Sequence, residues 1–237
     1  MSTQTLTPAG RAVRGTLRRR LLVNAVVDPD EAASRLPSGL RPHVVGSGTV
    51  VGCCLLEVDH LRPASLPAAT GVTMRAAASR ISAEWVDEAS GEQVVGVYVP
   101  GRVTDSRLAV ALGGRWFPGV HRPARVDVRA APGRLAWQVD DDAADLGLHV
   151  VVSWSHGGPA VTDGDPVGVT CLGATLGLSP TRHGGLEAAR MEPGDRRARP
   201  VVVEELDSTF LSGFATASPA PAYLMEGVAV AWSAARS

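Results

Sequence analysis

The sequence predicts one α+β domain, mostly β, in which a strongly curved antiparallel sheet forms a cone-like barrel with two or three short helices. Three observations favour this class. Apolar or alternating segments of strand length follow one another along the chain, and only a few stretches carry helix-capping residues. No repeat, low-complexity block or linker divides the sequence, whereas a doubly wound parallel sheet would need many more helices. We expect residues 1–17 to form an N-terminal tail and residues 18–237 to form the single domain.

The first half of the chain reads as strands with one early helix. Asp28 is a suitable cap and Pro29 a suitable first residue for that short helix, which is expected to end at Pro37 and Gly39. The nearly continuous apolar run at 49–59 is typical of a strand buried on both faces. The strands expected in this half span 18–27, 49–59, 72–87 and 94–99.

Another helix is predicted at 104–114, with Thr104 or Asp105 as its cap and Gly113 with Gly114 as its end. Immediately after it, a bend containing a Pro-Gly step leads into a new strand. Further strands are expected at 146–155, 183–193, 200–210 and 222–234.

A hairpin is expected around the Pro132-Gly133 turn, because apolar and polar residues alternate on both sides of it. A further helix is predicted within 165–180, capped at Asp165 and started by Pro166. The inner layer of the hairpin should consist of Val126, Val128, Leu135, Trp137 and Val139.

The charge balance excludes some partners. A formal net charge of -1 lacks the basic excess that nucleic-acid or anionic-membrane binding normally needs, so we expect a small-molecule ligand instead. No apolar run approaches the roughly 20 residues that span a bilayer, and no secretory signal is recognised. With only Cys53, Cys54 and Cys171, the chain is expected to be cytoplasmic.

All 23 of the lysines and arginines counted together are arginines, so the chain contains no lysine. A guanidinium stays protonated and is not an amine nucleophile, which excludes both a Schiff base with a carbonyl substrate and a pyridoxal-phosphate aldimine on a side chain. The Arg18, Arg19 and Arg20 run is expected to be a solvated strand edge, with binding of an anionic ligand as the alternative.

Segments 18–42, 50–59 and 96–128, with 165–193 later, resemble a bacterial family of YqjF-like proteins in the acetoacetate decarboxylase-like superfamily. The resemblance implies a conical sheet whose mouth holds a small organic acid or ketone, and members that decarboxylate, dehydrate, cyclise or perform aldol-type chemistry. Acetoacetate decarboxylase itself uses a Schiff-base lysine, which this chain lacks. The glutamate that relatives tend to carry corresponds to a position near Ala76 here.

The bend after the predicted helix carries two candidate catalytic residues. A guanidinium of Arg115 at the barrel mouth would clamp a carboxylate and stabilise an enolate. His121 would carry the proton, because an imidazole titrates near neutral pH. The alternatives are a surface salt bridge for Arg115 and a strand-entry hydrogen bond for His121. Trp116 and Phe117 are expected to form pocket wall or core.

Arg80 lies in an alternating strand, and the resemblance places it on an arginine of the family. If Arg80 points inward, it requires an anionic partner, because an isolated buried charge is costly. That partner would be the substrate or a protein carboxylate such as Glu57 or Glu84, although outward positions are commoner for both glutamates.

Tyr98 is expected either to present its hydroxyl to a pocket beside Arg102 or to lie at the sheet rim. Glu204 and Glu205 face opposite sides if their strand is regular, so one of them would point inward as a candidate general base. A plain solvated edge is the alternative for both.

These observations favour an enzyme that acts on a small carboxylate or polyketide-like carbonyl compound by electrostatic and acid/base catalysis. It would be of the decarboxylase, dehydratase or cyclase type, and a homo-oligomer is possible. The alternatives are a non-catalytic barrel that binds an anionic metabolite and an interaction domain. If the chain is an enzyme of this type, we expect a cavity that contains Arg115 and a group that titrates near neutrality.

Neither a cofactor nor a metal site is indicated, because the histidines lack ligand spacing and no C-x-x-C occurs.

Overall fold

The computed structural model describes residues 12–87, 91–141, 143, 145–155, 165–195 and 197–235. Its helices are α1 (Pro29–Ala33), α2 (Arg107–Leu112), α3 (Pro166–Gly173) and α4 (Thr209–Ser212), with a 3-10 turn at Ala68–Thr70. Its strands are β1 (Ala12–Val27), β2 (Arg41–Pro42), β3 (Val44–Val45), β4 (Gly48–Pro63), β5 (Val72–Val86), β6 (Gln93–Tyr98), β7 (Arg102–Thr104), β8 (Arg122–Pro123), β9 (Arg125–Ala131), β10 (Arg134–Asp140), β11 (Leu148–Ser153), β12 (Leu176–Pro180), β13 (Leu186–Pro193), β14 (Arg199–Ser208) and β15 (Ser218–Ala235).

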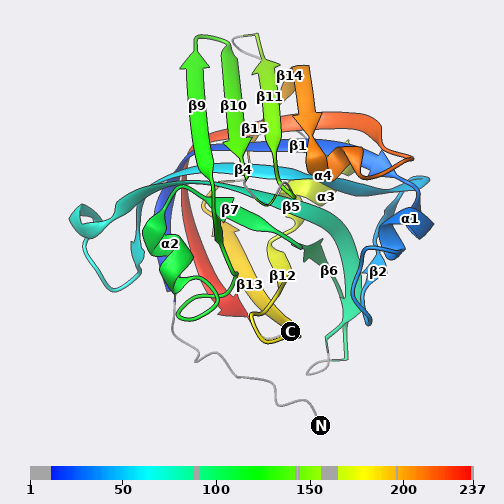
Figure 1. The fold of residues 1–237 in the computed structure, drawn as a ribbon, viewed down its shortest axis with the longest axis horizontal. Coiled ribbons are helices and arrows are strands. Elements are labelled where there is room, and N and C mark those ends of the chain that lie inside the picture. Colours follow the sequence, from blue (N-terminus) through cyan, green and yellow to red (C-terminus); the bar gives the residue numbers. More distant parts are fainter. Residues whose placement is uncertain are drawn as a thin grey trace.

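The strands form a closed ring, which confirms the predicted cone-like barrel. Around the ring the order is β1, β4, β5, β6, β12, β13 and β15, and β15 pairs again with β1. Neighbouring strands are antiparallel except β6 and β12, which are parallel. Closing the sheet removes the exposed edges that an open sheet would present. The long strands β1, β4 and β15 supply most of the wall (Figure 1).

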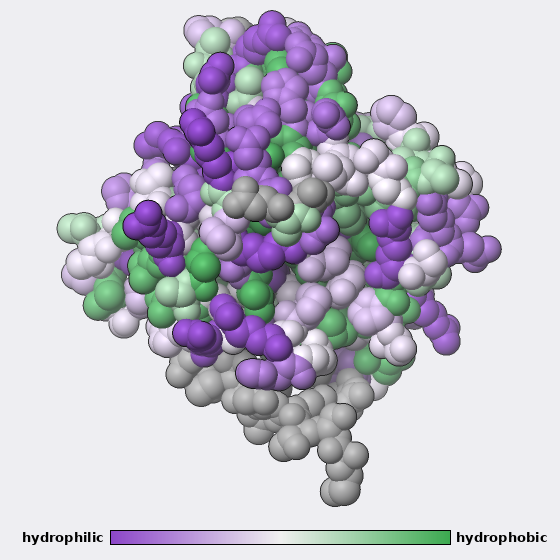
Figure 2. All heavy atoms as spheres, in the orientation of Figure 1, coloured by the Kyte–Doolittle hydropathy of each residue, from purple (hydrophilic) through white to green (hydrophobic). Residues whose placement is uncertain are grey.

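A second layer packs on the outside of this ring. Strands β9, β10, β11 and β14 lie side by side and run across the direction of β1 and β4 (Figure 1). The core between the layers includes Leu21 and Ile81 from the ring and Trp137 and Val150 from the second layer, all fully buried. The projecting end of the second layer is mostly hydrophilic (Figure 2).

Strand register decides which side chains face the inside of the ring. Residues directly opposite each other share one face of a sheet, and alternate residues share it along a strand. Leu22, Cys54 and Ala78 are directly opposite one another, and their neighbours on this face form a second apolar cluster with Met225. Cys171 and Leu172 of α3 pack on that cluster. This face is the interior, because the other face carries the second layer and exposed charges.

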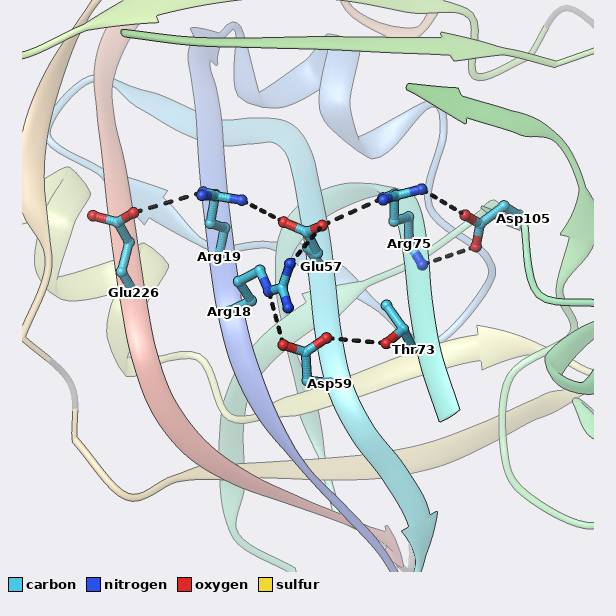
Figure 3. A network of polar contacts seen from close by, with 8 residues as sticks. All are labelled: Arg18, Arg19, Glu57, Asp59, Thr73, Arg75, Asp105 and Glu226. Carbon is cyan, nitrogen blue, oxygen red and sulfur yellow. Dashed lines mark hydrogen bonds and ion pairs between the residues drawn. The ribbon is translucent and has the colours of Figure 1, made fainter. Parts of the chain in front are cut away.

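Charged side chains form one row across the outer face of the ring (Figure 3). Arg19 of β1 bonds to Glu57 of β4 at 2.6 Å, and Glu57 also pairs with Arg75 of β5 at 3.4 Å. Glu226 and Asp105 extend the row on either side. Because the Glu57 side chain is only 3% exposed, these arginines supply the charge compensation that its burial requires. Glu57 is therefore a partner of outer arginines and not of Arg80.

Local signals predicted most element ends. Asp28 caps α1 and Asp165 caps α3, each by accepting a backbone N–H, as expected. For α2 the cap is Ser106, and not Thr104 or Asp105. The first strand begins at Ala12, within the segment expected to be a tail, because its pairing with β4 and β15 continues to that point.

The predicted hairpin forms as expected, with Trp137 opposite Val128 and Val139 opposite Val126. Four short α-helices occur in the described ranges, where two or three were expected, and the additional one is α4. Within these ranges no helix is long and apolar enough to cross a membrane.

Candidate functional site

Arg80 of β5 is a buried charged residue of the ring and is only 5% exposed. It lies on the inner face because it follows Ala78 by two residues on the same strand. Gly52 of β4 is directly opposite Arg80, and Asn24 of β1 is directly opposite Gly52. One guanidinium nitrogen of Arg80 donates to the side-chain oxygen of Asn24, and another donates to the backbone oxygen of Cys171 at 3.5 Å. Neither acceptor is a carboxylate, so among the described residues the hydrogen bonds of this guanidinium go to neutral groups.

Arg20 of β1 is also a buried arginine, and it lies further along the same inner face. It is 4% exposed, and one of its guanidinium nitrogens lies 3.7 Å from the sulfur of Met225. Tyr223 of β15 lies between the two arginines along the strands, since it is directly opposite Leu22. The Nε atoms of Arg20 and Arg80 and the hydroxyl of Tyr223 are buried without a hydrogen-bond partner among the described residues. Buried polar groups normally have hydrogen-bond partners, so a ligand with acceptor oxygens could bind these three donor groups.

Arg102 of β7 also faces inward, since it is directly opposite Ala78. Its guanidinium donates to the hydroxyl of Ser179 at 2.5 Å. Ser179 of β12 is in turn directly opposite Glu187 of β13, which places that carboxylate on the inner face. Burial lowers the pKa of Arg102 to about 10, and the nearby charge of Glu187 partly offsets this change. Arg102 nevertheless stays protonated at neutral pH.

The bend at 113–121 covers this end of the ring. Gly119 has φ +101, and a Cβ atom there would lie 2.5 Å from a guanidinium nitrogen of Arg102, so only glycine fits without displacement. The Gly119 N–H donates to the Glu187 carboxylate at 2.7 Å. Arg182 donates to the backbone oxygen of Gly113 at 3.0 Å and so holds the start of the bend. The bend thus fixes Glu187 near Arg102.

His121 lies at the end of this bend, with Nδ1 3.0 Å from the backbone oxygen of Gly119. A carbonyl oxygen only accepts, so Nδ1 carries the proton and Nε2 is free of one in the neutral ring. Burial, together with the positive charge of Arg102, lowers the pKa of His121 to about 4. The imidazole is therefore neutral at pH 7, and the expectation that it titrates near neutrality is wrong.

A recess of about 190 Å³ opens at this end of the ring. Arg102 and Ser179 line it, together with Val120 of the bend and Arg182. Arg115 is not among its lining residues. A recess of about 330 Å³ lies on the outer sheet, where Asp140, His149 and Asp207 line it away from the inward-facing arginines.

The structure places the other candidates of the bend near its surface. Arg115 is exposed, whereas Trp116 and Phe117 are partly buried. The Trp116 N–H donates to the backbone oxygen of Leu112, and the Gly114 N–H donates to that of Phe117. The helix stop therefore turns Arg115 outward, and it is Gly119, four residues later, that approaches the interior.

Tyr98 lies on the opposite face of the ring wall from Arg102. It is directly opposite Ile81, and both side chains belong to the core between the two layers. Burial raises the pKa of Tyr98. Its side chain consequently has a packing role, and the expected placement in a pocket beside Arg102 is not observed.

Glu204 and Glu205 are both exposed on β14. The pairing of β14 with β11 shifts at this point, since Val151 is opposite Glu205 while Val152 is opposite Val203. Glu204 is thus the extra residue of a β-bulge, which breaks the alternation that would have turned one glutamate inward. Arg134 pairs with both carboxylates, at 3.1 Å from Glu204 and 3.8 Å from Glu205. Neither is available as a base for the interior.

Sequence reasoning missed Asn24, Glu187 and Tyr223. Glu187 has a detectable signal, because the residues two and four positions later in its strand are the apolar Ala189 and Met191. Asn24 and Tyr223 sit within apolar segments and resemble ordinary core positions, so only strand pairing brings them to Arg80 and Arg20.

Metal-ligating residues do not gather at this site. Across the described ranges, no group of three or more His, Cys, Asp or Glu side chains is arranged to hold a metal ion. His156 lies outside those ranges.

Solved structures with the same fold are found at low sequence identity. The acetoacetate decarboxylase of Legionella pneumophila superposes with a TM-score of 0.66 at 13% identity, covering 98% of this chain and 88% of that one. An acetoacetate decarboxylase-like enzyme from Sphingomonas wittichii gives 0.64 at 15% identity, covering 100% and 98%. The enduracididine biosynthesis enzyme MppR, complexed with pyruvate, gives 0.62 at 12% identity, covering 98% and 91%. No family model and no curated protein matches the chain. The chain therefore has the acetoacetate decarboxylase-like fold.

Proposed function

We propose that this chain is an enzyme that binds a small carboxylic acid inside the ring and stabilises its enolate without forming an imine. One observation carries the proposal: Arg20 and Arg80 are buried on the inner face, and their hydrogen bonds to the described part of the chain include none to a carboxylate. Leaving a buried charge unpaired costs several kcal/mol, and a substrate carboxylate would remove that cost. A guanidinium also matches a carboxylate in shape, because two N–H groups can point at its two oxygens.

Groups for acid/base chemistry lie at the same end of the ring as the recess. Arg102 is a fixed cation suited to an enolate oxygen. Glu187 is the inward-facing carboxylate, and it takes the role of proton acceptor that we expected of Glu204 or Glu205. When the C–H bond next to the substrate carbonyl breaks, its proton passes to Glu187 and its electron pair moves to the carbonyl oxygen beside Arg102.

His121 has a narrower role in this proposal than the sequence suggested. With a pKa of about 4, its conjugate acid is too strong to act as a proton reservoir at neutral pH. The unprotonated Nε2 instead accepts a hydrogen bond from substrate or water. Arg115 is exposed, so the enolate-stabilising role moves from Arg115 to Arg102.

Similar proteins support a small oxo acid as the substrate class. The MppR structure holds pyruvate, and the chain shares its fold. The absence of lysine removes the side-chain imine route from this chain, so electrostatic stabilisation of the enolate replaces it in this proposal. Membership of the YqjF-like family, the cytoplasmic location and the lyase or cyclase reaction type are further proposals, and they rest on the sequence alone.

Deuterium exchange tests stabilisation of the enolate, which is the intermediate that decarboxylation, dehydration and cyclisation have in common. Pyruvate is incubated with the protein in D₂O, and loss of its methyl proton signal is followed by NMR. We expect catalysed exchange in the wild type, and a loss of about 100-fold in Arg102→Met and in Glu187→Gln. The exposed Arg190→Met variant is the control and should exchange at the wild-type rate.

If the wild type binds pyruvate but exchanges no protons, the non-catalytic binding barrel replaces the enzyme. Exchange that persists in Glu187→Gln would assign the proton acceptor elsewhere. Thermal unfolding of each variant shows whether a lost rate reflects a lost fold.

A further inference from the structure

The recess of about 190 Å³ beside Arg102 is lined by three arginines. Arg102 comes from β7, Arg122 from β8 and Arg182 from the turn between β12 and β13. No acidic side chain is among the described residues that line it. Three like charges around one small space repel one another, and a bound anion removes that repulsion. The recess is therefore suited to an anionic group.

Carboxylates hold two of these guanidinium groups from outside the recess. Arg122 donates to Asp141 at 2.7 Å and to Asp145 at 2.9 Å, and the Asp141 side chain is only 2% exposed. The charge of Glu187 raises the pKa of Arg102 against the larger effect of burial. None of these three carboxylates lines the recess, so they fix the arginines in place and leave the recess side cationic.

Arg182 is an arginine of the recess whose charge meets no carboxylate in the described chain. It donates to the backbone oxygens of Gly113 at 3.0 Å and Val110 at 3.4 Å, and both bonds leave from the same terminal nitrogen. Its other terminal nitrogen and its Nε have no acceptor among the described residues. Arg102 likewise makes a single hydrogen bond to them, which goes to the hydroxyl of Ser179. Both guanidinium groups therefore keep donors for a ligand.

The number and origin of these arginines favour a phosphate group over a carboxylate. One guanidinium matches both oxygens of a carboxylate, so a carboxylate does not need three. A phosphate group carries three acceptor oxygens that point in different directions, which suits donors that arrive from three separate elements. The volume of about 190 Å³ is below the roughly 300–1,000 Å³ of sites that enclose a drug-sized ligand, so the recess fits one such group and not an entire substrate.

We propose that this recess binds a phosphate group, and that the substrate of the proposed function is a small oxo acid that carries one. The second part rests on the proposed function and specifies its substrate class. Arg102 connects the two, because it lines the recess and also faces the ring interior opposite Ala78. A phosphate group in the recess lies next to the position proposed for the enolate oxygen.

Calorimetric titration with inorganic phosphate tests the site, and acetate is the carboxylate probe. In Tris chloride buffer at pH 8, where phosphate is mostly doubly charged, we expect the wild type to bind phosphate at least about tenfold more tightly than acetate. Arg182→Met should lose at least about tenfold in phosphate affinity, because it removes a charge-assisted contact. Arg190→Met removes an exposed arginine and should bind phosphate as the wild type does.

Phenylglyoxal labelling of the wild type gives a result that does not depend on how a variant folds. The reagent modifies accessible arginines, and both Arg182 and Arg190 are exposed. At a phosphate concentration of about ten times Kd, labelling of Arg182 should slow about tenfold while that of Arg190 is unchanged, as measured by peptide mapping with mass spectrometry. Acetate at the same concentration should slow the labelling of Arg182 about twofold or less.

A phosphate ester distinguishes phosphate carried by a substrate from free phosphate. Glycerol 3-phosphate presents the same group on a short carbon chain. If it binds as tightly as inorganic phosphate, the recess accepts an ester, as the proposal requires. If it binds at least about tenfold more weakly, the recess takes free phosphate and the proposed substrate class is wrong.

The outcomes also separate this inference from the function on which it rests. If phosphate binds no more tightly than acetate, or if it does not protect Arg182, the inference fails. The proposed function is then still judged by proton exchange on pyruvate, which carries no phosphate. If phosphate binds as expected but the wild type exchanges no pyruvate protons, the proposed function fails, and the assignment of the phosphate group to its substrate fails with it.

Discussion

Adjacent arginines on β1 have opposite surroundings. Arg19 faces outward and bonds to Glu57, which is itself almost completely buried. Arg20 faces inward, where its contact is the sulfur of Met225. The residue type is the same in both cases, so strand alternation decides whether the guanidinium meets the carboxylate of Glu57 on the outer face or the sulfur of Met225 on the inner face.

This difference predicts opposite effects of the same substitution. Arg19→Met should lower the free energy of unfolding by about 1–2 kcal/mol, because Glu57 loses its shortest ion pair. Arg20→Met should leave the stability unchanged or raise it, because it removes an uncompensated buried charge. Urea unfolding at pH 7 measures both values. If Arg20→Met is the more destabilising variant, Arg20 has a structural partner and is not poised for a ligand.

His121 predicts a pH dependence of stability. Its folded-state pKa of about 4 lies below the ordinary value of 6.5, so the unfolded chain binds more protons between these values. Stability is therefore lost as the pH falls from about 6.5 toward 4, and we expect a decrease of about 1–2 kcal/mol at pH 5 from this residue. Urea unfolding of the wild type and of His121→Gln at pH 7 and pH 5 measures it. An identical decrease in both proteins would exclude His121 as the cause.

At the scale of elements, the bend after α2 contacts both Glu187 and Arg102. Its glycines turn the chain so that Arg115 is exposed while the Gly119 backbone contacts Glu187 and approaches Arg102. The bend therefore acts through its backbone more than through its side chains. This explains why Arg115, although conspicuous in the sequence, is exposed and does not line the recess.

Two glycine substitutions separate the backbone strain of the bend from its contact with Arg102. Gly39 has φ +91 and Gly119 has φ +101, but a Cβ at Gly39 meets no atom within 4 Å. Gly39→Ala should cost about 1 kcal/mol from strain alone. Gly119→Ala should cost at least twice that amount and also weaken binding of a carboxylate probe, because Arg102 has to move. Equal costs with unchanged binding would show that the bend does not position Arg102.

At the scale of the whole molecule, the ring separates two chemical environments with one wall. Its outer face packs against a second sheet or carries paired charges, while its inner face gathers guanidinium groups around apolar and small residues. A low-dielectric interior strengthens the attraction between these guanidinium groups and an anion. The same arrangement on an open sheet would be screened by water.

The absence of lysine predicts the outcome of a trapping experiment on the intact protein. Borohydride reduction in the presence of pyruvate should give no covalent adduct on any side chain, as measured by mass spectrometry with peptide mapping. A lysine-dependent aldolase treated in parallel should gain the mass of the reduced ligand. An adduct that maps to an inward-facing residue of this chain would contradict imine-free catalysis.

Local patterns predicted much of the fold. The hairpin layer around Trp137 follows from strict alternation, and the caps Asp28 and Asp165 follow from hydrogen bonds made within a few residues. Arg80 was identified as an inward candidate on similar grounds. Alternation failed at Glu204, because a bulge depends on pairing with a strand about fifty residues away.

The sequence by itself determined a curved, mostly antiparallel barrel without a side-chain amine nucleophile, because strand periodicity and residue identity are local properties. Only the tertiary structure decided which face of each strand is enclosed, since that depends on the closure of β15 onto β1. Closure brings Arg20, Arg80 and Tyr223 from distant segments to one interior, and it places Tyr98 and Glu205 outside it. Burial turns these arginines into a candidate anion site, and burial is a property of the whole ring.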